Sequence, residues 1–160
     1  MKKLIFRFNN KGTKSNFYSK EVLGGKGANL MQMANLGLPV PPGFTISTKV
    51  CDIFYKSNKK IPKKIILQAK KEINIIENIT KKKFGSLSNP LLVSVRSGSK
   101  VSMPGMMDTI LNLGLNDKTV LALKNKTLNG RFAKDSYRRF IQMYSNVVLG
   151  VDSYLFEELI

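Results

Sequence analysis

Apolar and polar residues follow one another along the chain in patterns that predict short strands and longer helices. Apolar residues from Leu4 to Phe8 precede a run of Asn, Lys and Gly, which predicts an edge strand followed by a turn. From Leu30 to Leu36, apolar residues recur at helical spacing and stop at Gly37, a residue type that commonly ends helices. The glycine-rich segment just before Leu30 is predicted to be a loop that opens this helix.

The next stretch is punctuated by proline. Three prolines between positions 39 and 42 exclude a helix and predict an extended connection. A strand is expected over 44–46, and Ser47 or Thr48 is suited to cap the short helix that follows. From Pro62, isoleucines recur every three or four positions as far as Ile79 with lysines between them, which predicts a long helix with one packed stripe.

The second half repeats the alternation of strand and helix. Residues 91–95 are continuously apolar apart from one serine, and they predict a buried strand that runs into Arg96. Beyond it the pattern predicts a strand over 110–113, a short helix ending at 123, a longer helix from 131 to the glycine at 150, and a capped helix from 152. The last helix has no C-cap, so the chain is expected to be cut short; a short terminal helix docked on the core is the alternative.

Length and composition then bound the class of protein. The 160 residues suffice for one domain or a piece of a larger one, and 42% apolar residues allow a real core. No apolar run approaches the roughly 18 residues of a membrane span, and the start lacks the apolar core of a signal peptide. Cys51 is the only cysteine and can form no internal disulfide. A cytoplasmic protein without membrane partner is expected.

The sequence contains no histidine. Its absence excludes a histidine general base, a Ser-His-Asp triad, a histidine metal ligand and a phosphohistidine within this chain.

The net charge of +17 suggests an anionic partner, but its composition argues against nucleic acid. Only five of the 27 basic residues are Arg, and the Lys surplus accompanies many Asn and Ile, the residues that an AT-rich genome supplies in excess. Because base recognition and bidentate phosphate contacts favour Arg, a solvated surface shaped by mutational drift is preferred over a nucleic-acid footprint.

Three basic elements could nevertheless meet at a polyphosphate. Residues 24–29 read Gly-Gly-Lys-Gly-Ala-Asn, where glycines allow backbone N–H groups to approach an anion and Lys26 could reach an outer phosphate; taken alone, such a segment is more often only a turn. Arg96 ends the predicted buried strand and could clamp a phosphate or pair with a carboxylate of the fold. In the helix from 131, Arg138 and Arg139 point about 100° apart, so only one is expected to face the same site. No carboxylate pair for Mg²⁺ accompanies them, and Asp108 is the nearest single candidate.

These segments resemble, in family order and over nearly the whole chain, the N-terminal nucleotide-binding domain of pyruvate, phosphate dikinase. The resemblance rests on five stretches: residues 23–30, 37–44, 94–98, 102–117 and 135–144. Phosphoenolpyruvate synthase and related dikinases share the glycine-lysine loop and the arginine strand, whereas Met-Pro-Gly-Met-Met-Asp-Thr at 103–109 is more similar to the pyruvate, phosphate dikinase branch.

The resemblance implies an α+β fold, the N-terminal portion of an ATP-grasp type nucleotide-binding domain, with a small sheet, flanking helices and a helical C-terminal part. It implies a subdomain over 1–115 that holds the glycine loop and the arginine strand, followed by a truncated helical segment over 116–160. The family's domain binds MgATP and passes the β-phosphoryl group to a histidine on a swivelling domain, which then phosphorylates pyruvate on a third.

Position by position, the resemblance implies cofactor-binding roles for Lys26, Arg96, Gly105 and Arg139. Lys26 and Arg96 match residues that contact ATP phosphates, with Arg96 as the catalytic candidate. Gly105 matches a loop over the nucleotide, although the methionines around it could equally fill core gaps. Arg139 matches a further phosphate-site arginine.

The family's metal-binding acids and nucleotide-positioning Gln lie beyond Ile160, so no metal ligand is expected within this chain and weak ATP binding without turnover is expected from it alone. The leading hypothesis is a truncated or split ATP-binding part of the dikinase, whose partners are ATP and the remaining domains. The alternatives are a basic module that binds anions or nucleic acid, and a gene remnant without function.

Overall fold

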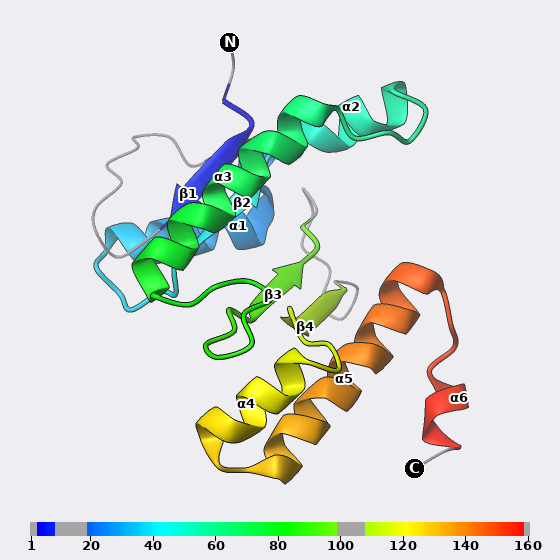
Figure 1. The fold of residues 1–160 in the computed structure, drawn as a ribbon. Coiled ribbons are helices and arrows are strands. Elements are labelled where there is room, and N and C mark those ends of the chain that lie inside the picture. The colour runs from blue at the N-terminus through cyan, green and yellow to red at the C-terminus, as the bar shows by residue number, and fades with distance from the viewer. Residues whose placement is uncertain (1–2, 9–18, 99–107, 159–160) are drawn as a thin grey trace. The chain divides into compact units, whose positions relative to one another are not determined.

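The computed structural model describes residues 3–8, 19–98 and 108–158. The chain divides into two compact units, which Figure 1 shows with their elements labelled. Among the described residues, the first unit comprises 3–80 together with Gly98, and the second comprises 81–97 and 108–158. The predicted boundary after residue 115 concerned the family's subdomains and stays a prediction; that position lies inside the second unit.

The first unit is built on a two-stranded antiparallel sheet. Strand β1 (Ile5–Phe8) pairs with β2 (Gly43–Ile46) in the register Ile5 to Ile46 and Phe8 to Gly43. Both predicted strands are therefore confirmed. Helix α1 (Lys20–Asn35) contacts both strands and contributes most of a buried apolar cluster, whose members are Phe8, Leu23, Ala28, Met31, Ala34 and Val40.

The glycine-rich segment does not open helix α1. The helical stretch starts at Lys20, where the Ser19 side chain accepts a hydrogen bond from the Glu21 N–H. Gly24 then breaks the helix, because its backbone (φ 70°, ψ 166°) lies in a region that only glycine adopts readily. A second helical stretch begins directly after Gly24, as predicted, but a helical turn capped by Ser19 precedes it where a loop was expected.

Helix α1 ends as its pattern predicts. Gly37 has a φ of 78°, and its N–H donates to the carbonyl of Ala34 while the Leu38 N–H donates to that of Met33. These two bonds form a Schellman motif, which satisfies carbonyl groups at the end of a helix. The extended connection through Val40 then leads into β2.

Two further helices complete the first unit. Helix α2 (Lys49–Lys56) follows Ser47, whose hydroxyl accepts from the Lys49 N–H, and α3 (Lys63–Thr80) follows Pro62 as predicted. An ion pair ties α3 to the sheet: the Arg7 Nε donates to the Glu72 carboxylate at 2.6 Å and a second guanidinium nitrogen donates to it at 3.1 Å. Hydrogen bonding to Glu72 raises the pKa of Arg7, so the guanidinium stays charged.

The second unit places a two-stranded ribbon against helices. Strand β3 (Val93–Arg96) pairs antiparallel with β4 (Thr109–Leu113), with a register shift between Val93 and Val95. Helix α4 (Thr119–Thr127) and the long helix α5 (Gly130–Leu149) pack against each other, and α5 also contacts β4. A short helix, α6 (Tyr154–Glu157), follows the left-handed Gly150. The described strands thus form two small sheets in a mixed helix and strand fold.

Strand β3 is not the buried strand that its apolar run predicts. Leu91, just before it, is buried, but Val95 is 46% exposed and Arg96 is exposed. In the described part of the unit, β3 pairs with one neighbour only, so its other edge carries no strand. An apolar run alone does not distinguish a central strand from a ribbon strand.

Candidate nucleotide site

Lys26 lies on α1, two residues after the break at Gly24, and is partly buried. Its ammonium group forms no hydrogen bond or ion pair with the residues that the structure describes. A partly buried cation without a protein partner is able to bind an anion without first breaking another interaction.

Gly27 has a packing role that its sequence context left open. A β-carbon at this position would lie 2.7 Å from Thr45 Cγ2 and 3.0 Å from Thr45 Oγ1. Helix α1 therefore approaches strand β2 more closely at Gly27 than any residue with a side chain allows. The close contact between helix and strand is therefore enough to explain why residue 27 is a glycine.

Arg96 is the last residue of β3 and pairs with Thr109 of β4. The ribbon continues one step further, because Ser97 donates both its N–H and its hydroxyl to the Asp108 carbonyl, at 3.0 and 3.2 Å. The sequence left two roles open for Arg96, which were clamping a phosphate and pairing with a carboxylate of the fold. Its side chain forms no ion pair with any residue that the structure describes. The residue is exposed, and none of the five guanidinium donors is used in a bond to the residues that the structure describes.

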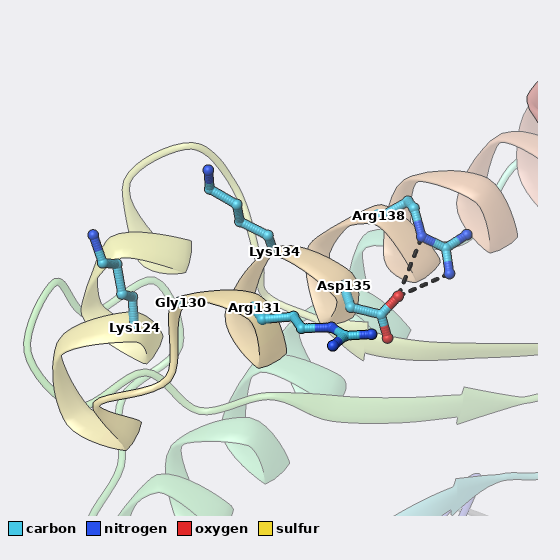
Figure 2. Close-up of a pocket in the computed structure, with 6 residues that line it drawn as sticks. All are labelled: Lys124, Gly130, Arg131, Lys134, Asp135 and Arg138. Carbon is cyan, nitrogen blue, oxygen red and sulfur yellow. Dashed lines mark hydrogen bonds and ion pairs between the residues drawn. The ribbon is translucent and has the colours of Figure 1, made fainter. Parts of the chain in front are cut away.

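Arg138 and Arg139 share one carboxylate. Arg138 donates from Nε and a terminal nitrogen to Oδ1 of Asp135, at 3.2 and 2.8 Å, and Arg139 donates from Nε to Oδ2 at 2.8 Å. Figure 2 shows the bonds between Asp135 and Arg138. All three side chains are at least two-fifths exposed. Spacings of three and four residues bring a carboxylate and a cation together on a helix. The pairing of Asp135 with the two arginines could therefore have been predicted from the sequence.

A cavity of about 580 Å³ lies between the start of β4 and the middle of α5. Its lining includes both arginines, because long side chains that reach back to one carboxylate offset the 100° between their backbone positions. Neither Lys26 nor Arg96 lines this cavity, so it stays a prediction that only one of the two arginines faces the same site as the other basic residues. The lining residues are Asp108, Thr109, Arg138, Arg139, Gln142, Met143, Asn146, Val147 and Ser153.

Arg96 and Arg139 belong to the same end of the second unit. Arg139 lines the cavity, and so does Thr109, the partner of Arg96 in the ribbon. Directly opposed residues of an antiparallel pair have α-carbons about 5 Å apart, so the backbone of Arg96 lies one strand spacing from the cavity wall. Lys26 belongs to the first unit, and Gly105 lies outside the described residues.

The carboxylate that holds the arginines is charged at neutral pH. Hydrogen bonds from Arg138 and then Arg139 lower the pKa of Asp135 below its ordinary value. Nearby, the Tyr137 hydroxyl donates to Asp117 at 2.8 Å, and this bond raises the pKa of Tyr137. Arg139 uses only its Nε in the bond to Asp135, so its terminal nitrogens can still donate to a phosphate.

No group of three or more His, Cys, Asp or Glu side chains suited to a metal ion occurs within the described ranges. Asp108 is the only carboxylate among the described residues that line the cavity, so these residues do not form a Mg²⁺ site. In the same part of the chain, none of the helices has both the length and the apolar character to cross a membrane.

Comparison with known proteins shows what the chain is similar to. Residues 20–83 match the family described as pyruvate phosphate dikinase, AMP/ATP-binding domain. The chain is 55% identical over 159 residues to a pyruvate, phosphate dikinase of Rickettsia conorii, with 99% of this chain aligned. The chain is homologous to the AMP/ATP-binding part of pyruvate, phosphate dikinase.

The homology extends beyond one bacterial group. Pyruvate, phosphate dikinases of Rhizobium meliloti and Clostridium symbiosum are 50% and 51% identical to this chain over 160 residues. In each of these relatives the chain spans only 18% of the length. The resemblance to pyruvate, phosphate dikinase that the five sequence stretches carry is therefore confirmed.

Proposed function

We propose that this chain supplies one wall of the ATP site of a pyruvate, phosphate dikinase, which converts ATP, phosphate and pyruvate to AMP, diphosphate and phosphoenolpyruvate. Homology to a pyruvate, phosphate dikinase over 99% of the chain, with the match to the AMP/ATP-binding family over residues 20–83, carries the proposal. The fold proposed for it is the front portion of an ATP-grasp type domain. The remaining domains, and the ligands of the Mg²⁺ that accompanies ATP, belong to the part of the relatives that this chain does not span.

In the proposed site, Lys26, Arg96 and Arg139 bind the phosphates of one ATP and Gly105 belongs to a loop over the nucleotide. The availability of Lys26 and Arg96, neither of which has a partner in the described part of the chain, supports these roles. Arg96 is the proposed catalytic residue, because a guanidinium fork can stabilise the charge that spreads over the oxygens of a phosphoryl group in transfer.

Asp135 is proposed as a positioning residue for Arg139. Its carboxylate holds the Nε edge of that guanidinium, and the terminal nitrogens remain for phosphate. Fixing a donor before the ligand arrives reduces the reorganisation that transfer requires.

The test measures ATP affinity by calorimetry with this chain supplemented by the remaining part of the nucleotide-binding domain from the Rickettsia conorii relative. Lys26→Met and Arg96→Gln are each expected to weaken ATP binding about ten-fold or more, since a charge-assisted hydrogen bond contributes about 1.5–3 kcal/mol. Lys20→Met, at the exposed start of α1, is the matched control and should leave affinity unchanged. Unchanged affinity in both site variants would overturn the assignment.

A further inference from the structure

A second basic surface lies on the helix pair α4 and α5. It is a groove of about 640 Å³, and we call it the basic groove. Figure 2 shows Lys124 of α4 and Lys134 of α5 extending in the same general direction, while Arg131 runs toward Asp135. Among the described residues of the proposed ATP site, Lys26, Arg96 and Arg139 do not line it. Its lining residues are Lys124, Gly130, Arg131, Lys134, Asp135 and Arg138.

Helix geometry gathers these cations on one face. Arg131, Lys134 and Arg138 are separated by three and four positions, so they follow one another along about 10 Å of α5. Lys124 joins them from α4, where its aliphatic stem lies 3.5 Å from the position of a β-carbon on Gly130. Asp135, the one carboxylate in the lining, is already bonded to two arginines, so the groove keeps a positive excess.

The placement of these charges is unfavourable for the helix itself. Arg131 and Lys134 occupy the first two turns of α5, where the helix dipole favours anions and disfavours cations. Like charges three positions apart on a helix also repel each other. For Lys134, no ion pair with the described residues offsets this cost, whereas Arg131 runs toward Asp135, four positions further along the helix.

Leu128, at the junction of α4 and α5, is a second position where the local conformation lowers the stability of the fold. It ends α4 in a left-handed conformation with a φ of 53°, which Gly and Asn adopt far more readily than Leu. Its side chain is 91% exposed, and Phe132 in the first turn of α5 is half exposed. Single exposed apolar residues are common on protein surfaces, whereas backbone strain is concentrated at functional sites, so the strained conformation of Leu128 is what points to a contact with another molecule.

We propose that the basic groove docks an acidic segment of a partner polypeptide, with an apolar side chain of that segment covering Leu128. Charge complementarity favours acidic residues in the segment that binds the groove cations. A polypeptide can also place an apolar side chain on Leu128, whereas a phosphate chain has no apolar group for this contact. The groove cations would then form the charged rim around an apolar contact.

The test uses fluorescence anisotropy at low salt with two labelled peptides of glutamates, one interrupted by leucines and the other by serines. Inorganic polyphosphate and a single-stranded DNA oligonucleotide of equal charge serve as competitors. The leucine peptide is expected to bind more tightly than the serine peptide and to resist displacement by either competitor.

Three variants locate the binding. Arg131→Glu combined with Lys134→Glu is expected to weaken the leucine peptide about ten-fold, as two lost and reversed surface pairs predict. Leu128→Asn should weaken it several-fold while leaving the serine peptide unaffected. The matched control reverses the same number of charges at Lys63 and Lys70, on exposed positions of α3, and should have no effect.

Each other outcome overturns the proposal. Polyphosphate or DNA binding as tightly as the leucine peptide, and insensitive to Leu128→Asn, would make the groove a phosphate site. Absence of peptide binding would make it a solvated surface. Circular dichroism separates either result from misfolding, because Leu128→Asn relieves a strained backbone and should retain the helix signal. None of these changes alters a residue of the proposed ATP site.

Discussion

At the scale of single residues, close contacts explain positions that the sequence presents only as motif letters. Gly24 is required by its backbone conformation and Gly27 by the approach of α1 to Thr45. Neither requirement involves a nucleotide. A glycine-rich segment can therefore serve the fold and a ligand at once, and its variants must be measured for both.

Replacing Gly27 with Ala should destabilise the first unit by about 1–3 kcal/mol, the usual effect of forcing extra atoms into a packed contact. Chemical denaturation of the purified chain measures this. Thr45→Ala removes both atoms that the new methyl group would meet, so the double variant should recover part of the loss. If the effects of the two substitutions on the free energy of unfolding were strictly additive, contact with Thr45 would not be the cause of the loss.

The acid titration of Asp135 provides a second residue-scale prediction. Its folded pKa is below the unfolded one, so the ion pairs stabilise the chain at neutral pH and their contribution disappears as pH falls below about 4. Carbon NMR of the Asp135 carboxyl group should report a midpoint below the ordinary aspartate value of about 3.9. A midpoint at or above that ordinary value would contradict the hydrogen bonds from Arg138 and Arg139.

At the scale of elements, most strands and helices could be predicted because their signals are local. Periodic isoleucines, Pro62 and the glycines at 37 and 150 set the limits of three helices nearly correctly. The start of α1 could not be placed, because the cap at Ser19 competes with the glycines downstream. The exposure of β3 could not be read from its own residues, since it depends on how many strands pair with it.

Helix α5 offers the clearest element-scale test. Asn129 caps it by accepting a hydrogen bond from the Phe132 N–H at 2.9 Å. Asn129→Ala should lower the free energy of unfolding of the second unit by about 1 kcal/mol, whereas Asn129→Ser should lower it little. Hydrogen exchange in the first turn of α5 measures the effect locally. Equal protection in both variants and the unaltered chain would mean that the cap does not hold the helix.

The ion pair between Arg7 and Glu72 joins an element to the sheet over 65 residues of sequence. Glu72→Gln should lower the free energy of unfolding of the first unit by about 1 kcal/mol, given that both side chains are partly buried. Thermal denaturation at low and high salt provides the measurement. Arg7→Gln and the double variant complete a mutant cycle, and strictly additive losses would point to net charge rather than to this bond.

At the scale of the whole molecule, the residues of the proposed site come from both units. The sequence could indicate them only through family resemblance, because no local pattern links Lys26 to Arg96 across 70 positions. Asp135 and the α5 cations of the basic groove could have been found from helical spacing, whereas the position of Lys124 beside them depends on the packing of α4 against α5. The cavity beside Thr109 could not, since it depends on the packing of a ribbon against a helix.

The net charge of +17 also acts on the whole chain. Self-repulsion destabilises a compact state, and salt screens it as the Debye length falls from about 30 Å at 0.01 M to about 8 Å at 0.15 M. The thermal midpoint should therefore rise over this range, equally in sodium chloride and potassium fluoride. A thermal midpoint that rises in sodium sulfate but not in the other two salts would indicate specific anion binding instead of screening.

The central claim is that Lys26, Arg96 and Arg139 bind the phosphates of one ATP. A crystal structure of this chain, supplemented with the rest of the nucleotide-binding domain and a non-hydrolysable ATP analogue, measures it directly. Phosphate oxygens should lie at hydrogen-bond distance, about 2.7–3.2 Å, from all three side chains. A triphosphate bound elsewhere, with Lys26 and Arg96 still in solvent, would contradict the account.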